Sequence, residues 1–226
     1  MNIEKNIINI KKKISIAAYE SNRNPQEITL LAVSKYKSCE NISDAIKAGQ
    51  YQFAENYAIE GFKKIQYFSY NDKIIWHFIG SLQTNKTKII AQYFDWFHAL
   101  DNEKIAKRLN SQRSHYKSKL NVLIQINISN ENSKSGVKLN NLNDLVEKII
   151  NMPNLLFRGF MVIPAFESDY NKQYDTFYKV KCIFNIFKNK YSTVDTLSMG
   201  MTNDIKAAIH CGSTIVRIGT GIFGVR

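Results

Sequence analysis

The sequence predicts an α/β fold, a single (β/α)8 barrel of the TIM type with one extra helix at its amino terminus. Short apolar runs of strand length alternate with segments whose apolar residues recur at helical spacing, and the runs number about eight. The length of 226 residues lies within the range of such barrels. No linker, internal repeat or low-complexity tract divides the chain, so we expect one domain over residues 1–226. Eight strands separated by helices favour a closed barrel over an open doubly wound sheet.

The first half of the chain sets up this alternation. Residues 2–21 carry isoleucines at steps of four and three, which predicts an amphipathic helix before the first strand. The first strand, residues 30–35, is an unbroken apolar run that ends in Lys35, as expected of a strand covered on both faces. The expected elements that follow are a helix ending at Gly49, a strand over 52–56, a helix over 57–68, a strand over 75–80, a helix over 86–93, a strand over 96–100 and a helix over 102–118.

The second half continues the pattern after its strongest β signal, residues 122–128. A polar loop over 129–136 precedes a helix over 142–150, in which the apolar residues form one stripe and which Pro153 closes. The remaining expected elements are a strand over 157–163, a helix over 170–187, a strand over 196–200, a helix around 205–209 that ends at Gly212, and a strand over 214–219.

Charge and composition exclude several classes of protein. The net charge of +12 and the pI near 9.5 would suit a nucleic-acid binder, but the lysines are scattered, so we interpret them as a solvated surface. No apolar stretch is long enough to span a bilayer, and the amino terminus lacks a cleavable signal core. We therefore expect a cytoplasmic protein without a membrane or nucleic-acid partner.

The cysteines and histidines predict neither disulfides nor a metal site. The cysteines are odd in number and widely spaced, and the histidines lack the spacing of metal ligands. The residues concerned are Cys39, Cys182, Cys211, His77, His98, His115 and His210.

Lys35 has two interpretations. Because side chains alternate along a strand, Lys35 shares a face with Leu31 and Val33, and this face should line the interior of the closed sheet. Either the strand has ended and the amine reaches water along its flexible stem, or Lys35 is a Schiff-base lysine that reacts as the free amine. The ends of the other strands bear on this choice.

Active sites of such barrels form at the carboxyl ends of the strands, where this chain carries residues suited to a phosphorylated aldehyde. Residues 217–224 end the last strand and open a glycine-rich turn whose amide groups would cradle a phosphate, although glycines also serve plain tight turns. Arg217 falls within a buried strand and needs an acceptor, which a carboxylate, a pyridine nitrogen or a phosphate would provide. Asn56 would either orient a ring hydroxyl or cap the next helix. The other strand-end residues are Gly80, Ser198, Gly219 and Thr220.

Several stretches spread through most of the chain form a recognisable pattern. They cover residues 31–35, 55–57, 76–80 with 82–83 and 85–86, 121–127, 134–136, 197–201 and 216–220. On these residues the chain resembles the pyridoxal phosphate homeostasis protein family, which is a single-domain relative of the amino-terminal barrel of alanine racemase. No single short motif carries the resemblance.

The resemblance implies a site for pyridoxal 5′-phosphate (PLP). Lys35 would hold PLP as a Schiff base, Ser198, Gly219 and Thr220 would bind its phosphate, and Arg217 would face the pyridine nitrogen. An arginine there keeps that nitrogen unprotonated and weakens the ring as an electron sink. The family accordingly implies a carrier in homeostasis of the vitamin B6 pool, without robust turnover and with PLP-accepting apo-enzymes as possible partners. The chain departs from the family's common residues at Ala54, Thr202 and Gly221, which bears on phosphate affinity.

Two other functional hypotheses compete with PLP homeostasis. A PLP-dependent amino-acid racemase would need a second acid/base on the opposite face of the cofactor, which alanine racemases supply from an added domain. The chain ends at Arg226 directly after the barrel, so we expect no such domain, although a tyrosine such as Tyr57 would be a substitute. Nucleic-acid binding through the net charge of +12 is the third hypothesis. A barrel closed by its own packing is expected to be a monomer.

Overall fold

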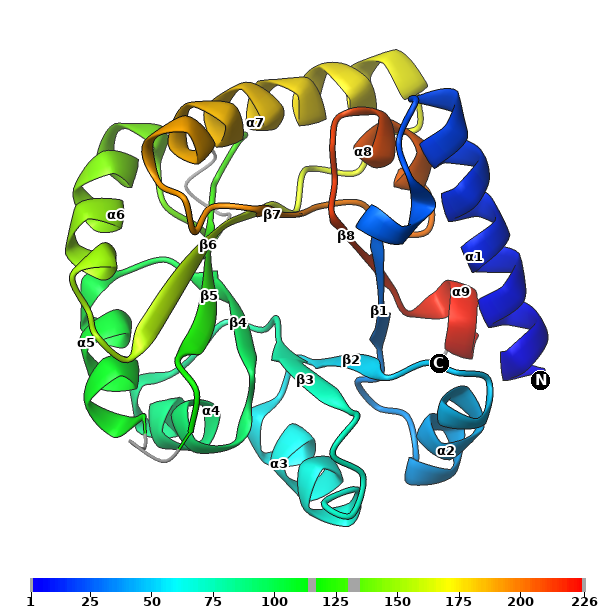
Figure 1. Cartoon of the computed structure of the whole chain (residues 1–226), viewed down its shortest axis with the longest axis horizontal. Helices are drawn as coiled ribbons and strands as arrows, with labels where there is room; N and C mark the ends of the chain where they lie inside the picture. Colours follow the sequence, from blue (N-terminus) through cyan, green and yellow to red (C-terminus); the bar gives the residue numbers. More distant parts are fainter. Residues whose placement is uncertain (1, 114–116, 130–134, 225–226) are drawn as a thin grey trace.

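Eight parallel strands close into a barrel in the computed structural model, which describes residues 2–113, 117–129 and 135–224. Each strand pairs with the next along the chain, and β8 pairs with β1 to complete the ring of strands in Figure 1. The strands are β1 (Thr29–Val33), β2 (Gln52–Glu55), β3 (Ile75–Phe78), β4 (Trp96–Leu100), β5 (Leu120–Gln125), β6 (Leu155–Met161), β7 (Thr196–Ser198) and β8 (Ile215–Ile218). The predicted fold class is confirmed.

The helices form an outer layer around the strands (Figure 1). Their buried apolar residues join those of the strands in one hydrophobic cluster, as the helical spacing predicts. The α-helices are α1 (Ile3–Glu20), α2 (Cys39–Lys47), α3 (Ala58–Tyr67), α4 (Thr87–Tyr93), α5 (Glu103–Gln112), α6 (Leu142–Ile150), α7 (Tyr170–Lys190), α8 (Ile205–His210) and α9 (Thr220–Phe223). Short 3-10 turns cover Pro25–Glu27, Thr84–Lys86 and Leu139–Asn141.

The extra amino-terminal helix, α1, lies beside α8 and α9, far from it in sequence (Figure 1). Its buried face consists of Ile3, Ile7, Ile10 and Ile14. The Asn6 side chain also donates a hydrogen bond to the carbonyl of Ile222 in α9, over 2.9 Å. The helix therefore supports the segment that follows β8.

The element boundaries differ from the predicted ones mainly at two strands. β5 and β6 both begin and end two or three residues earlier than expected. Register shifts also interrupt the pairing of β5 with β4 and with β6. β1 ends at Val33, so Lys35 lies in a turn and not on the strand. The helix expected over 102–118 ends at Gln112. Parts of the predictions for 102–118 and 129–136, together with His115 and Arg226, fall outside the described residues.

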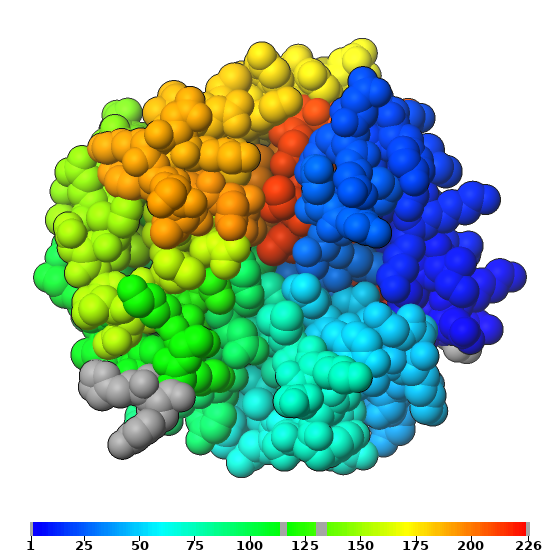
Figure 2. Space-filling model, in the orientation of Figure 1, coloured from blue at the N-terminus to red at the C-terminus, as the bar shows by residue number. Residues whose placement is uncertain are grey.

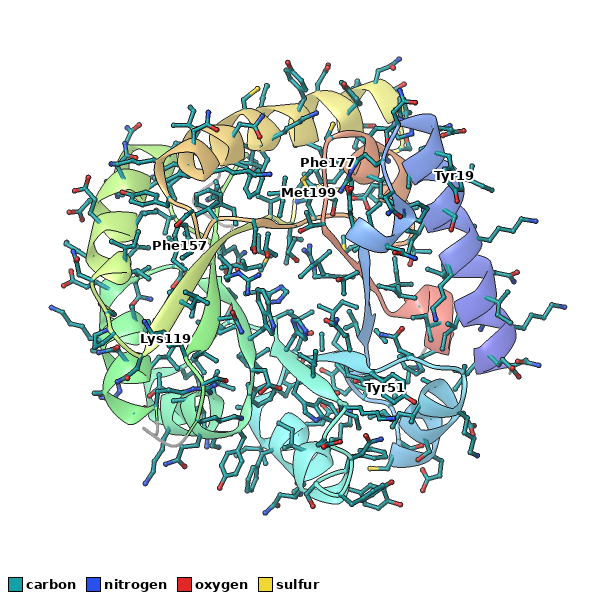
Figure 3. All side chains as sticks on the ribbon, viewed as in Figure 1. Tyr19, Tyr51, Lys119, Phe157, Phe177 and Met199 are labelled. Atoms are coloured by element: carbon teal, nitrogen blue, oxygen red, sulfur yellow. The ribbon has the colours of Figure 1, made fainter. Side chains whose placement is uncertain are left out.

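The inside of the barrel is partly polar. Leu31, Val33, Ala54 and Ile215 form a small apolar cluster there, which confirms the inward direction predicted for the alternate residues of β1. Barrels of this class usually fill the interior with branched apolar side chains. Here four buried polar residues share that space, and the side chains inside the ring of strands are drawn in Figure 3. They are His77, His98, Ser198 and Arg217.

In the part of the chain that the structure describes, no helix is both long and apolar enough to cross a membrane.

Candidate functional site

A cavity of about 530 Å³ opens at the carboxyl ends of the strands. Its walls come from the turns after β1, β2, β7 and β8 and from the segment between β6 and α7, all distant in sequence. Five of the six residues predicted to form a site line this cavity: Lys35, Asn56, Arg217, Gly219 and Thr220. The topology thus brings together residues that the sequence places up to 185 positions apart (220 − 35).

Lys35 lies in a turn that is held from both sides. The carbonyl of Ser34, just before it, accepts a hydrogen bond from the Lys64 ammonium over 2.7 Å. The amide of Tyr36, just after it, donates to the Glu60 carboxylate over 2.6 Å. Tyr36 has a φ of +61°, in the left-handed region that non-glycine residues seldom adopt. The hydrogen bond to Glu60 holds this conformation and with it the direction in which Lys35 leaves the backbone.

Lys64 and Glu60, which hold the Lys35 turn, belong to a buried ionic network between β2 and α3. Lys64 is 5% exposed and pairs with Glu55 at 2.8 Å and with Glu60 at 2.7 Å. The Ser34 hydroxyl donates to the same Glu55 oxygen over 2.6 Å. Burial raises the pKa of the Glu55 carboxyl, and the Lys64 ammonium acts in the opposite direction. A single cation on α3 thus joins the ends of β1 and β2 beneath the cavity.

Asn56 presents an unpartnered oxygen at the wall of the cavity. Its Oδ1 atom is buried and accepts no hydrogen bond from any described residue. The alternative role as a helix cap is wrong, because Tyr57 is the first flanking residue of α3 and no side chain caps this helix. The end of β3 packs directly on Asn56: a Cβ added at Gly80 would lie 2.2 Å from the Asn56 carbonyl oxygen. A buried, unsatisfied oxygen of this kind points to a ligand that donates a hydrogen bond.

Arg217 is bound by neutral acceptors. One of its terminal nitrogens donates to the Ser198 carbonyl over 2.7 Å and to the Ser198 hydroxyl over 2.8 Å, and the other donates to the Val162 carbonyl over 2.8 Å. Among the described residues, no carboxylate lies within ion-pair distance of Arg217. Burial lowers the pKa of Arg217 to about 10, and the Asp204 carboxylate acts against this shift.

Arg217 therefore keeps donors for a ligand. A guanidinium has five N–H groups, of which these hydrogen bonds use three. The described residues provide no acceptor for the other two, and Arg217 lines the cavity at 4% exposure. With its pKa near 10 the group remains a cation at neutral pH.

Ser198 differs from the other predicted site residues. Its side chain is fully buried inside the barrel, where it contacts Arg217 and His98. It is not part of the cavity wall, so the expectation that its hydroxyl binds a phosphate is revised: that hydroxyl is already engaged below Arg217. Thr202, four positions later, does line the wall, as does the predicted Thr220.

Two further residues of the site were missed in the sequence. Asp204 lines the cavity beside Thr202, and burial raises the pKa of its carboxyl. Lys64 belongs to a lysine-rich helix and looks like a surface residue, since its burial depends on Glu55, which lies on another element. A lysine placed four residues after an acidic residue, Glu60, was the available signal, but this spacing is common on exposed helices.

The turn after β8 lies beside the Lys35 turn, because β8 pairs with β1, although the two turns are far apart in sequence. α9 begins at Thr220, directly after Gly219. The first N–H groups of a helix have no acceptor within it, so the amides of Thr220 and Gly221 remain available. A Cβ at Gly219 would lie 3.4 Å from the Val33 carbonyl oxygen, in ordinary van der Waals contact with the end of β1.

Comparisons with known proteins now identify the family. A family profile, "Alanine racemase, N-terminal domain", matches residues 21–226. The pyridoxal phosphate homeostasis protein of Pasteurella multocida (strain Pm70) is 52% identical over 100% of this chain and 98% of its own length. The protein of that name from Escherichia coli (strain K12) is 50% identical over 99% of this chain and 97% of its own length. The chain belongs to the pyridoxal phosphate homeostasis protein family.

A solved structure has the same fold. PipY of Synechococcus elongatus PCC7942, with PLP bound, is 26% identical and superimposes with a TM-score of 0.81 over 93% of this chain and 100% of that chain. The fold of this chain is thus shared with PipY.

Two of the three departures from the residues common in the family lie next to each other. A Cβ at Gly221 would lie 2.9 Å from the Ile218 side chain and 3.3 Å from the Thr202 hydroxyl. Thr202 is larger than the common serine and Gly221 is smaller than the common alanine, so the two changes compensate in volume. The third, Ala54, packs inside the barrel and away from the cavity wall.

A second cleft, of about 690 Å³, lies at the amino ends of the strands. Figure 2 shows this face, with residues 185–195 in orange and residues 23–29 in blue on either side of residues 211–215 in red. Its arginines have partners: Arg158 forms a two-pronged ion pair with Asp195, and Arg23 donates to the carbonyls of Ile209 and Ser213. Gln52 lines this cleft from inside the barrel.

Proposed function

We propose that the protein binds PLP in the cavity at the carboxyl ends of the strands and takes part in cytoplasmic homeostasis of the vitamin B6 pool. The observation that carries the proposal is the set of groups around this cavity: the Lys35 amine, the Arg217 cation with two spare N–H groups, and the buried Asn56 oxygen. The names of the relatives and the PLP-bound PipY structure support it.

The residues present fit the functional groups of PLP. Lys35 would hold the aldehyde as a Schiff base, and Asn56 would accept a hydrogen bond from the ring hydroxyl. The amides of Thr220 and Gly221, with the Thr202 hydroxyl, would bind the phosphate. The spare N–H groups of Arg217 would meet the pyridine nitrogen. When bound, PLP supplies an electron sink for chemistry at the α-carbon of amino acids.

We further infer that this site does not support robust turnover. A hydrogen bond donated by Arg217, which stays charged at neutral pH, keeps the ring nitrogen unprotonated and weakens the electron sink. The protein would then hold and release PLP, as a monomer, for apo-enzymes that accept the cofactor.

The first test follows the PLP absorbance of the purified protein. The wild type is expected to show the band of a protonated imine, and borohydride reduction is expected to fix the cofactor on Lys35, which peptide mass analysis would locate. Lys35→Ala abolishes both signals because no amine remains at that position. Lys35→Arg is the matched control, since it keeps the positive charge and cannot form the imine. An apo-like spectrum of the wild type with added PLP contradicts the proposal.

The second test addresses turnover. The PLP-loaded protein is incubated with a panel of amino acids in deuterated water, and α-proton exchange is followed by NMR. We expect exchange no faster than with free PLP. Rapid, Lys35-dependent exchange would mean that the protein is an enzyme.

A further inference from the structure

A line of hydrogen bonds crosses the inside of the barrel from the cavity to the opposite cleft. Arg217 donates to the Ser198 hydroxyl over 2.8 Å, and that hydroxyl lies 3.1 Å from Nδ1 of His98. Nε2 of His98 lies 2.9 Å from Nδ1 of His77, whose Nε2 lies 3.0 Å from the Gln52 side-chain oxygen. We name these five residues the barrel chain. Arg217 lines the cavity and Gln52 lines the cleft at the other end.

The two histidines of the barrel chain are neutral. Both are fully buried, and burial lowers the pKa of His77 to about 3 and that of His98 well below its usual value. The neighbouring charge of Arg217 acts on His98 in the same direction. A neutral imidazole has one N–H group, so each ring is a donor on one side and an acceptor on the other.

The donors can be assigned because the two rings bond to each other. One N–H group must lie between His98 and His77, so both rings adopt the same tautomer. If both carry the proton on Nε2, then Ser198 donates to His98, His98 to His77, and His77 to the Gln52 oxygen, and every donor has an acceptor. If both carry it on Nδ1, the Ser198 hydroxyl receives two donors and its own hydrogen has no acceptor among the described residues. The first arrangement is therefore favoured.

We propose that His98 and His77 are positioning residues for the cofactor site, which act by holding the Ser198 hydroxyl as an acceptor for Arg217. Nδ1 of His98 accepts a hydrogen bond from the Ser198 hydroxyl, so a lone pair of the Ser198 oxygen faces the Arg217 guanidinium. Arg217 is thereby fixed with its spare donors toward the cavity. This inference rests on the proposed function, since it assigns Arg217 to the pyridine nitrogen of PLP.

The cost of this arrangement argues against a purely space-filling role. Apolar side chains would fill the interior without polar groups to satisfy, whereas each buried histidine needs two partners. The barrel chain provides these partners only in one orientation. Space-filling and positioning roles make different predictions for the cofactor, because only positioning connects His98 with the environment of the ring.

The decisive experiment compares two variants at the same position. His98→Phe removes the acceptor of Ser198, and we expect PLP to dissociate at least about fivefold faster, with a shift in the pH at which the imine absorbance changes. His98→Asn offers an oxygen close to the former position of Nδ1, and we expect near wild-type behaviour. His77→Phe leaves Ser198 with its acceptor and should give an intermediate effect.

The outcomes separate this inference from the proposed function. If the wild type forms the Lys35-dependent imine but His98→Phe matches it in dissociation rate and in titration, the inference fails and the function stands. If the wild type forms no imine, the proposed function fails.

A second measurement needs neither variant nor cofactor. In 1H–15N NMR spectra of the wild-type apo-protein, His98 and His77 are expected as neutral Nε2–H tautomers. An Nδ1–H tautomer or a charged ring at neutral pH, for either residue, overturns the inference.

Discussion

Lys64 shows how one buried cation supports a site that it does not touch. It lies outside the cavity wall, but it binds the carbonyl before Lys35 and the carboxylate that holds the amide after it. Its ion pair with Glu55 is almost completely out of water, with side chains 6% and 0% exposed. Removal of one partner from a buried ion pair leaves the other charge unpaired. Lys64 is therefore important for both stability and the Lys35 turn.

We predict that Lys64→Met lowers the free energy of unfolding by about 3 kcal/mol, because Glu55 loses its counterion in a buried position. Urea unfolding of the apo-protein measures this. Lys47→Met is the matched control, since the Lys47–Asp44 pair is exposed and should contribute less than about 1 kcal/mol. The double variant Lys64→Met with Glu55→Gln should lose less than the sum of its parts. Equal losses for Lys64→Met and Lys47→Met would contradict this role.

At the residue level, sequence reasoning identified the groups whose type is unusual for their position. Lys35 after an apolar run and Arg217 within a buried strand both stood out, and both line the cavity. Lys64, Asp204 and the two interior histidines did not, because their roles depend on partners on other strands and helices. The direction of the Ser198 hydroxyl likewise depends on His98, one hundred positions earlier.

At the level of elements, the contact between β2 and β3 shapes one wall of the cavity. Gly80 follows β3 and lies so close to Asn56 that no side chain fits between them. The close approach brings the end of β3 over the residue that carries the unpartnered oxygen. A change at Gly80 would therefore move Asn56 without altering any group of the site.

We predict that Gly80→Ala weakens PLP binding about tenfold or more, since a methyl group 2.2 Å from the Asn56 carbonyl oxygen forces the backbone apart. Titration of the imine absorbance measures this affinity. Gly212→Ala is the control. The φ of +90° at Gly212 strains any residue with a side chain, although the added Cβ would have 3.9 Å of space. Gly212 lines the cleft at the amino ends of the strands and not the cavity. This variant should lose stability and keep its affinity. Wild-type affinity in Gly80→Ala would refute the proposed role.

The boundaries of the elements were predictable to within a few residues because hydrophobic spacing decides which segments form helices and strands. Among the strands, the largest differences are at β5 and β6, where register shifts interrupt the pairing. Such shifts depend on which strands pair. The spacing of apolar residues within one strand carries no information about them.

At the level of the whole molecule, the two neutral histidines make stability depend on pH. In the unfolded chain a histidine takes up a proton near pH 6.5. In the folded protein His77 stays neutral down to about pH 3, and the pKa of His98 is also far below its usual value. The unfolded state thus binds more protons below pH 6.5. The stabilisation is complete above this pH and is lost progressively as the pH falls toward 3.

We predict that the free energy of unfolding falls on the order of 2 kcal/mol per histidine between pH 7 and pH 5. Glu55 and Asp204 have raised pKa values and offset part of the loss as they bind protons in the folded state. Urea unfolding across this range gives the slope, and His98→Asn should reduce it by about half because one of the two groups is absent. The same slope in the wild type and in His98→Asn would show that His98 does not contribute as a neutral ring.

The closed barrel itself was the most predictable property, since the alternation of strands and helices is visible along the whole chain. The polar interior was not, because a histidine in an apolar strand gives no sign of which ring it will meet across the barrel. The amphipathic helix at the amino terminus was evident, but its contact with the segment after β8 depends on closure of the ring.

Trp96 lies at the amino ends of the strands, where the barrel chain ends at Gln52. Its indole ring stacks on His77, with ring centroids 5.4 Å apart and planes inclined by 12°, and the Arg158 guanidinium lies 4.9 Å from the centroid of the same indole. Tryptophan emission responds to the charge of a ring in van der Waals contact with it. The other tryptophan, Trp76, packs against Phe53 and Phe68. In a Trp76→Phe background, Trp96 is therefore a fluorescent reporter of the charge on His77 that needs no added label.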